Sequence, residues 1–310
     1  MATFISAPSA RTDTICDWPM FRGGYEHKGV AADECSPDFE NIELLWTFNS
    51  KASFESSPIV VSNKIFQCSF DHLVRCLNLD DGSLIWQYKA FGSIFSTPFY
   101  DDGKIYFGDW FGLVYCLDAT NGEKIWTRQL DGEIHSSPIV IGEKIYFGCD
   151  DNFIYCLDKN SGETIWRFQT GYRVKSSPTI KDGKIYIGSG DRMFYCLDAA
   201  TGAQIWVFEC EGSVTTSCAL AYDNVYFGSW DHKVYCLTQN EGKLVWTFET
   251  LSNIESSPAV DAGYVYIGSN DYNLYCIDAM TGKQKWVFTA LDQKIVSSPA
   301  LCKSKVLVGS

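Results

Sequence analysis

The 310-residue sequence lacks any apolar run near the length of about 18 residues that a membrane-spanning helix needs. Its N-terminal stretch, MATFISAPSARTDTICDW, contains no apolar segment long enough for a secretory signal. Positive charge is also scarce, since 25 Lys and Arg face 38 Asp and Glu and leave a formal net charge of −13. We therefore expect no membrane insertion and no nucleic-acid partner, because phosphates demand a basic surface. The negative net charge is easier to reconcile with a neutral or basic partner.

Helical patterning is missing too, because no segment repeats its apolar residues with the 3.6-residue period of an amphipathic helix. Apolar residues nevertheless make up 46% of the chain and aromatic residues 15%, which is ample for a large core. The 13 cysteines occur without an export signal, which indicates free thiols in a reducing compartment and predicts a cytoplasmic protein.

What the sequence has in abundance is repetition, with several markers in phase at a spacing of 40 residues. Tryptophan recurs at Trp46, Trp86, Trp126, Trp166, Trp206, Trp246 and Trp286. Cysteine recurs at Cys76, Cys116, Cys156, Cys196, Cys236 and Cys276, and glycine at Gly82, Gly122, Gly162, Gly202, Gly242 and Gly282. A Ser-Ser-Pro group, once Ser-Thr-Pro, ends at Pro58, Pro98, Pro138, Pro178, Pro258 and Pro299. A period near 40 built from short strands is typical of a propeller blade.

One repeat, residues 133–168, contains four apolar runs of strand length, at 135–141, 144–148, 153–157 and 164–168. The links are two to six residues long, so neighbouring strands are expected to pair as antiparallel hairpins. The second and third runs are apolar at consecutive positions, which indicates burial on both faces, as between two blades. The proline in the first run places that strand at a blade edge, lining the central channel, because proline cannot donate to a ladder.

The repeated side chains are interpreted as structural. Cysteine is a small hydrophobe that tolerates full burial, so we expect it to pack between blades rather than to form disulfides or bind metal. Asp118 is expected to cap the last turn through its carboxylate, and Gly122 to supply a positive φ. Each repeated tryptophan is expected to staple one blade to the next.

We predict an all-β protein, a seven-bladed β-propeller of four-stranded antiparallel blades, closed by N- and C-terminal strands that share the last blade. Residues 1–40 form a partly disordered lead-in that contributes to closure, and residues 41–310 form the propeller. The third strand of the shared blade comes from residues 15–40 or is missing. If the chain is a fragment of a longer array, eight blades are the alternative. The expected blades lie near 54–89, 94–129, 134–169, 174–209, 214–249, 254–289, and 295–310 plus 41–50.

The repeat resembles that of the pyrroloquinoline-quinone-type (PQQ-like) propeller family. Its motifs here are Ser136-Ser137-Pro138, the segment IYFGC at 145–149, and YCLDKNSGETIW at 155–166. The resemblance covers 41–310 and implies the propeller fold, and the segment DWPMFRGGYEHKGV at 17–30 resembles the lead-in of many bacterial and archaeal members, which implies a prokaryotic source. Family dehydrogenases hold their quinone against a disulfide between adjacent cysteines, and no Cys-Cys dipeptide occurs here. The resemblance is therefore to the non-catalytic branch, with no cofactor, metal or catalytic residue expected.

Comparison of the internal copies shows where the repeat varies. The residue before each Ser-Ser-Pro, the turn between the second and third strands, and the position two residues later all change from blade to blade. In a four-stranded meander these positions lie on one face of the disc, so we predict that this variable face binds the partner. The predicted contacts are Glu55, Phe70, His72, Phe95, Trp110, His135, Asp150, Lys175, Arg192, Trp230, His232, Glu255 and Tyr272.

The leading functional hypothesis is a non-enzymatic scaffold that binds a protein or peptide, as a sensor or adaptor subunit of a larger complex. Trp110 and Trp230 are the favoured anchors, since aromatic side chains on a rim favour partner contact. One alternative is a small-molecule or carbohydrate-binding propeller that uses these aromatics as stacking platforms, and another is a degenerate quinoprotein. His135 and Lys175 could face each other near the channel mouth, but blade spacing disfavours a catalytic triad.

Overall fold

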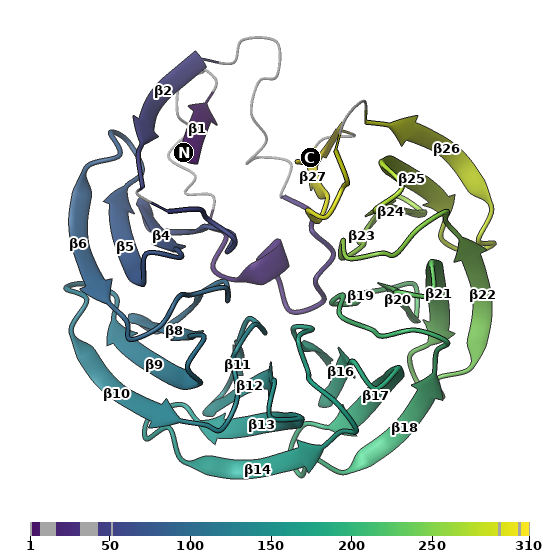
Figure 1. The fold of residues 1–310 in the computed structure, drawn as a ribbon, viewed down its shortest axis with the longest axis horizontal. Helices are drawn as coiled ribbons and strands as arrows, with labels where there is room; N and C mark the ends of the chain where they lie inside the picture. The colour runs from purple at the N-terminus through teal and green to yellow at the C-terminus, as the bar shows by residue number, and fades with distance from the viewer. Residues whose placement is uncertain are drawn as a thin grey trace.

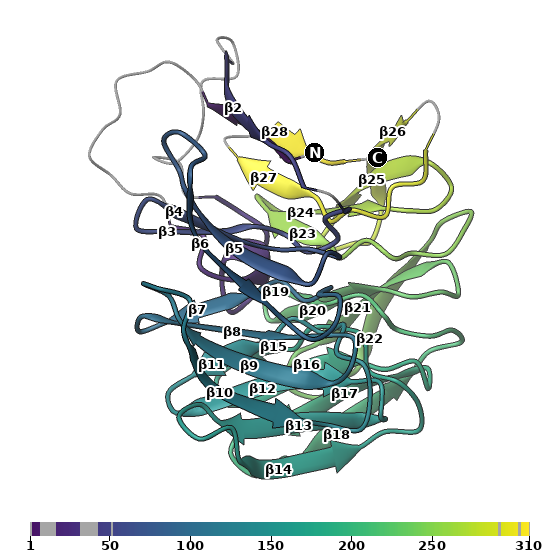
Figure 2. The same ribbon diagram turned by 60° about the vertical axis from the view of Figure 1, so that its left-hand side comes forward.

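The computed structural model describes residues 2–6, 17–31, 43–50, 52–290, 293–302 and 305–309. Six four-stranded antiparallel sheets surround a central channel, with the first strand of each innermost and the fourth outermost (Figure 1). Turned by 60°, the same blades are seen stacked so that each sheet faces the next (Figure 2). The predicted all-β propeller is confirmed, with six complete blades and a partial seventh. Among the described residues, no helix is long and apolar enough to cross a membrane.

The six complete blades are numbered in chain order. Blade 1 comprises β3 (Ile59–Val61), β4 (Lys64–Cys68), β5 (Leu73–Asn78) and β6 (Leu84–Lys89). Blade 2 comprises β7 (Phe99–Asp101), β8 (Lys104–Gly108), β9 (Leu113–Asp118) and β10 (Lys124–Gln129). Blade 3 comprises β11 (Ile139–Ile141), β12 (Lys144–Cys149), β13 (Phe153–Asp158) and β14 (Thr164–Gln169). Blade 4 comprises β15 (Thr179–Lys181), β16 (Lys184–Gly188), β17 (Met193–Asp198) and β18 (Gln204–Glu209). Blade 5 comprises β19 (Ala219–Ala221), β20 (Asn224–Gly228), β21 (Lys233–Thr238) and β22 (Leu244–Glu249). Blade 6 comprises β23 (Ala259–Asp261), β24 (Tyr264–Gly268), β25 (Asn273–Asp278) and β26 (Gln284–Thr289).

In blades 1 to 5 the repeated tryptophan joins each blade to the next, as predicted. Trp126 of blade 2 donates its indole N–H to the carbonyl of Lys159 in blade 3 at 3.0 Å. Its ring lies over Gly162, where a Cβ would approach the Trp126 ring to 2.7 Å, and Gly162 has a φ of +73°. Only glycine satisfies both conditions without strain. The same indole bond recurs from Trp86, Trp166, Trp206 and Trp246.

The Ser-Ser-Pro group also links the blades, around the channel. The first serine bonds within its own blade, as Ser176 does when it donates to the carbonyl of Gly188 at 2.6 Å. The second accepts from the backbone of the preceding blade, so the N–H of Ser137 donates to Ser177 Oγ at 2.9 Å. This bond recurs at six blade interfaces, with the acceptors Thr97, Ser137, Ser177, Ser217, Ser257 and Ser298. The motif therefore forms an incomplete ring of hydrogen bonds, which spans six blade interfaces.

The cysteines of the third strands are buried, as the packing interpretation predicted. Cys116, Cys156, Cys196 and Cys236 each have 0% exposed surface. All eleven cysteines described by the structure are free. Burial raises the pKa of Cys116 to about 11, and a raised pKa makes a thiol unreactive. Cys16 and Cys35 lie outside the described residues.

Two strand pairs, one from each end of the chain, lie at the place of the partial seventh blade. β27 (Ala300–Cys302) pairs with β28 (Lys305–Leu307), and β1 (Ala2–Ser6) pairs with β2 (Glu43–Phe48). Trp46 of β2 donates to the carbonyl of Leu79 in blade 1 at 3.1 Å, so β2 occupies the predicted outer-strand place. The predicted origin of the third strand in residues 15–40 is wrong, because the strand that pairs with β2 is β1. Within the described residues, these pairs are two separate two-stranded sheets.

Residues 17–31, with the short 3₁₀ helix η1 (Phe21–Gly23), form a strap across the channel (Figure 1). Strap backbone groups bond to the inner strands, and the carbonyls of Tyr25 and Glu26 accept from Ile180 and Leu220 at 3.1 and 2.9 Å. Further bonds reach Val60, Tyr100, Val260 and Leu301. The buried Arg22 donates to the carbonyls of Pro258 and Pro299, both at 2.5 Å. The strap therefore ties blades at opposite sides of the ring to one another.

Candidate functional site

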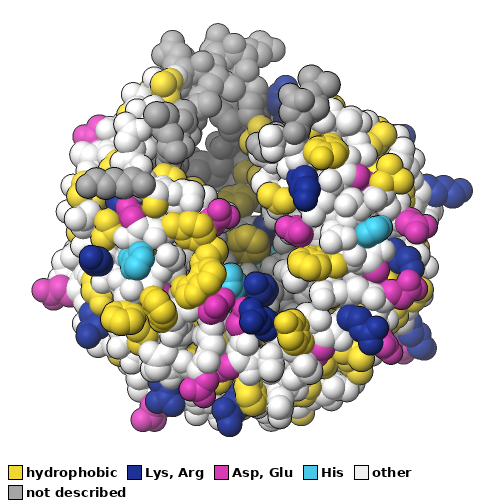
Figure 3. Space-filling model, in the orientation of Figure 1, with side chains coloured by type: hydrophobic (Ala, Val, Ile, Leu, Met, Phe, Trp, Pro, Cys, Tyr) yellow, Lys and Arg dark blue, Asp and Glu magenta, His cyan; other side chains and the backbone are white. Residues whose placement is uncertain are grey.

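The predicted variable positions do lie on one face of the disc. The links between blades and the turns between second and third strands meet there. The N–H of Asp150 donates to the carbonyl of Glu133, and the N–H of Trp110 to that of Ser93, both at 2.9 Å. Figure 3 shows hydrophobic, basic, acidic and histidine side chains around the central opening. The side chains of this face are thus carried by loops on a β-sheet frame.

An aspartate–tyrosine pair holds these loops in place in most blades. In blade 3 the hydroxyl of Tyr155 donates to Asp151 Oδ2 at 2.7 Å, and the N–H of Phe153 donates to Asp151 Oδ1 at 3.1 Å. Equivalent tyrosine bonds occur at Asp191, Asp231 and Asp271. Burial raises the pKa of these tyrosines, so they remain donors. In blade 1 the charged Arg75 replaces the tyrosine and pairs with Asp71. The frame of the face is therefore rigid although its exposed residues vary.

Four predicted residues from three blades form an aromatic wall at the channel mouth: Phe70, Phe95, Trp110 and His135. The Phe95 ring lies 4.4 Å from that of Phe70, 4.9 Å from that of Trp110 and 4.7 Å from that of His135, measured between centroids. Trp110 is 40% exposed, and the neighbouring Phe111 is 55% exposed. The wall therefore presents a connected aromatic surface to solvent.

A charged cluster adjoins the wall on blades 3 and 4. Asp150 lies at its centre, with its side chain only 4% exposed. His135 Nε2 is 3.1 Å from Glu133 Oε2 and 3.7 Å from Asp150 Oδ2. Arg173 Nη1 and Lys175 Nζ lie 3.5 and 3.9 Å from the same Asp150 oxygen. Burial raises the pKa of Asp150, and the nearby positive charges of His135, Lys175 and Arg173 oppose this effect.

A shallow cleft connects the aromatic wall with the charged cluster. It has a volume of about 520 Å³ and is lined by residues of both, including Trp110, Glu133, Asp150 and Arg173. The structure therefore brings together six predicted residues, Phe70, Phe95, Trp110, His135, Asp150 and Lys175. His135 and Lys175 both lie near the channel mouth, and each approaches the carboxylate of Asp150 between them. The imidazole of His135 hydrogen-bonds to the carboxylate of Glu133.

The other predicted residues do not join this group. The position after the turn has a left-handed backbone, with φ of 69° at His72, 75° at Arg192, 70° at His232 and 71° at Tyr272. In each of these four residues the carbonyl accepts from the end of its own fourth strand, which places it toward the outer rim. Trp230 is 44% exposed, and Glu255 is exposed and accepts from Asn270 at 3.0 Å. Glu55 is exposed.

Glu133 and Arg173 are site residues that the sequence comparison missed. Each lies two residues before the position that was compared between blades. The corresponding residues are Ser53, Ser93, Ser213 and Asn253 in the other complete blades, and Lys294 in the partial seventh blade. Among the six complete blades, only blades 3 and 4 carry a charge at this position, and this is the signal that would have identified Glu133 and Arg173.

The profile of the family described as outer membrane protein assembly factor BamB, of the PQQ type, matches residues 41–109, 70–171, 150–252 and 195–310. The chain belongs to this PQQ-like repeat family. No curated protein sequence matches the chain.

Several solved structures share the fold. BamB from Moraxella catarrhalis is 17% identical with a TM-score of 0.78, over 99% of this chain and 97% of that one. The computationally designed Ika8 protein is 14% identical with a TM-score of 0.76, over 86% and 84%. Quinohemoprotein alcohol dehydrogenase from Comamonas testosteroni is 14% identical with a TM-score of 0.69, over 94% and 76%. These neighbours include an assembly factor and an enzyme, so the function has to be argued from the variable face.

Proposed function

We propose that this protein is a non-enzymatic propeller scaffold that binds a protein or peptide through the aromatic wall of its variable face. The observation that carries the proposal is the continuous ring contact of the partly exposed Phe70 and Phe95 with the exposed Trp110 on a β-sheet frame. Exposed aromatics that touch one another and are surrounded by polar groups are typical of binding hot spots. Membership of a family described as an assembly factor supports the same role.

The partner is proposed to be neutral or basic. The whole chain carries a formal charge of −13, and Glu55, Glu133 and Glu255 lie along the links that surround the channel mouth. A basic partner would be attracted to this charge, whereas an acidic partner would approach against it. The proposed location is the cytoplasm, which cell fractionation tests directly. The proposed role within a larger complex is that of a sensor or adaptor.

The test is capture from an extract of the source organism with matched variants. The partner is defined as the protein retained by the native chain and by Glu163→Ala, which changes an exposed residue on the opposite face. Its affinity should then fall by about 30-fold or more on Trp110→Ala, the equivalent of about 2 kcal/mol at an anchor. An unchanged affinity for Trp110→Ala and for Phe95→Ala would show that the wall is not the binding surface.

The enzymatic alternative has its own measurement. Titration with pyrroloquinoline quinone and calcium, followed by absorbance, should give no saturable change if the protein is a scaffold. A saturable change together with dye-linked alcohol oxidation would establish a quinoprotein instead. This outcome is independent of the capture experiment, so each hypothesis can fail separately.

A further inference from the structure

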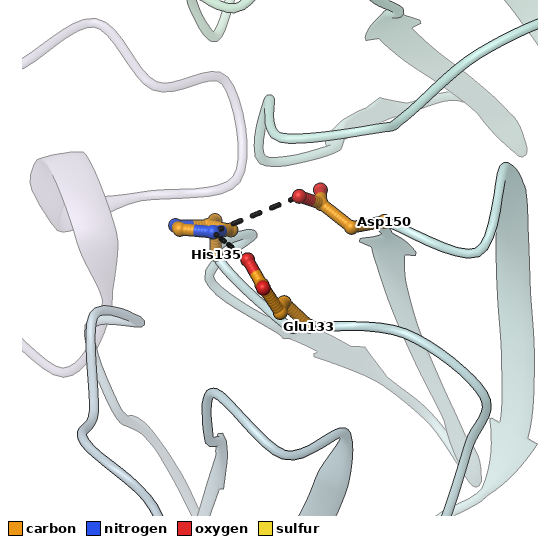
Figure 4. A group of neighbouring side chains, drawn as sticks. All are labelled: Glu133, His135 and Asp150. Atoms are coloured by element: carbon orange, nitrogen blue, oxygen red, sulfur yellow. Dashed lines mark hydrogen bonds and ion pairs between the residues drawn. The ribbon is translucent and has the colours of Figure 1, made fainter.

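The side chains of Glu133, His135 and Asp150 converge on one point beside the channel mouth. Figure 4 shows both carboxylates directed toward the imidazole of His135. One donor atom from each residue lies within 4.8 Å of the other two. Imidazole nitrogen and carboxylate oxygen are ligands that zinc and related divalent ions accept. The donor set is therefore chemically suited to a transition metal.

The distances between the donors are also suitable. Four ligands at 2.0–2.1 Å around a tetrahedral ion are separated from one another by about 3.3 Å. The nitrogen of His135 lies 3.1 Å from Glu133 Oε2 and 3.7 Å from Asp150 Oδ2. The third distance is that between the carboxylates of Glu133 and Asp150. The Glu133 side chain is 30% exposed, and rotation about its own torsions can shorten this distance. Three protein ligands would form without any shift of the backbone.

Asp150 supplies an independent reason to expect a ligand. Neither of its carboxylate oxygens has a hydrogen-bond partner among the described residues, although its side chain is only 4% exposed. A buried carboxylate without hydrogen bonds is costly, so such groups are normally hydrogen-bonded or bind a metal. The surrounding cations lie at 3.5–3.9 Å, beyond hydrogen-bond length. The carboxylate is thus directed into the cluster with its lone pairs unused.

We propose that Glu133, His135 and Asp150 bind one divalent transition-metal ion, with zinc as the best match. The site is confined to blade 3, because the corresponding residues are Ser93, Phe95 and Trp110 in blade 2. The ion bonds to one oxygen of each carboxylate and to Nε2 of the neutral imidazole. The fourth position opens toward the cleft.

Arg173 and Lys175 are competitors of the ion, because both approach the same carboxylate. Their side chains are 47% and 39% exposed, so both can withdraw into solvent when the metal binds. Removing either positive charge should therefore strengthen metal binding by several-fold. A cluster that serves only as an ion-pair network would bind no metal, with or without these cations.

The experiment is calorimetric titration of chelator-treated protein with zinc chloride. One ion per chain is expected, and His135→Gln or Asp150→Asn should weaken binding more than about 100-fold, beyond the effect of losing an outer hydrogen bond. Glu255→Gln alters the position of blade 6 that corresponds to His135 and should leave the affinity unchanged. Arg173→Ala and Lys175→Ala should raise it. Cobalt(II) should give a visible absorption band that His135→Gln lacks.

Two controls keep the result decisive. Thermal unfolding establishes that each variant is folded, and if His135→Gln is not, loss of affinity in Glu133→Gln decides the question. Cys16 and Cys35 lie outside the described residues, so the titration is repeated with both replaced by serine. Zinc binding that disappears in this double variant but persists in His135→Gln would overturn the proposal. A native protein that binds zinc no more tightly than Asp150→Asn would do so as well.

Discussion

The ring of hydrogen bonds between blades can be tested at Ser177. Its Oγ accepts from the N–H of Ser137 in blade 3, and its own N–H donates to Ser217 Oγ in blade 5, both at 2.9 Å. Ser177 is 6% exposed. The substitution Ser177→Ala removes the acceptor and leaves the N–H of Ser137 without a partner in a buried position.

The expected loss follows from that unsatisfied donor. Leaving a buried polar group without a partner costs about 1–3 kcal/mol, more than the net value of the bond itself. Large domains lose about 2 °C of melting temperature for each kcal/mol. Ser177→Ala should therefore lower the melting temperature by roughly 2–6 °C.

The repeat itself provides the matched control. Threonine occupies the same place at Thr97, where its Oγ1 accepts from Ser57 at 3.1 Å. Ser177→Thr should thus retain the bond and most of the stability. Glu163→Ala, at an exposed position of the opposite face, should change the free energy of unfolding by less than about 0.5 kcal/mol. Thermal and urea unfolding measure all three. Equal stability of the alanine and native proteins, or equal losses with alanine and threonine, would refute the ring as a stabilising device.

Three further predictions use matched changes. Gly162→Ala should cost about 2–4 kcal/mol in urea unfolding, because a Cβ would meet the Trp126 ring and the φ is +73°. Gly183→Ala has a similar φ of +72° but open space around it, so it should cost only about 1–2 kcal/mol. Cys156→Ser should be less stable than Cys156→Ala by about 1 kcal/mol, since serine buries a hydroxyl among apolar blades; equal stabilities would contradict this packing. Burial, with the charge of the strap arginine, lowers the pKa of His27 to about 3. The unfolded chain therefore binds a proton near pH 6.5, whereas the folded protein does not. The free energy of unfolding falls as pH drops from 6.5 toward 3, by about 2 kcal/mol at pH 5. His27→Gln should lose that share of the pH dependence. If the free energy of unfolding of the variant varies with pH as that of the native protein does, His27 is not the cause.

The repeat markers predicted the fold correctly because each marker serves a local purpose that recurs in every blade. The Trp126 ring packs on a glycine turn in the next blade, and Ser177 accepts a hydrogen bond from a backbone N–H in the preceding blade. These contacts recur at one fixed sequence spacing, so they are visible in the sequence as a repeat. The origin of the third strand in the seventh blade was predicted wrongly. The strand beside β2 is β1, which precedes it by an interval of 36 residues (7–42), where no repeat spacing applies.

The candidate site was predictable only in part. Comparison of the blades identified Phe95, Trp110, His135 and Asp150, because these positions vary while the frame does not. It did not indicate that Phe95 would contact rings from blades on both sides, since that depends on how far each side chain leans across the blade interface. It also missed Glu133, whose role arises from a distance of 3.1 Å to His135.

The sequence alone determined the number of complete blades, the strand order within each and the face that varies, because strand period, turn residues and the repeat length all act locally. Only the tertiary structure decided which variable residues meet. Asp150 gains its importance from burial beside groups of two blades, and burial is a property of the packed blades. The course of the strap is likewise tertiary, because its backbone bonds use strands separated by up to 241 residues, from Val60 to Leu301. The strap lies outside the repeat, so no repeated spacing in the sequence indicates which inner strands its backbone groups reach.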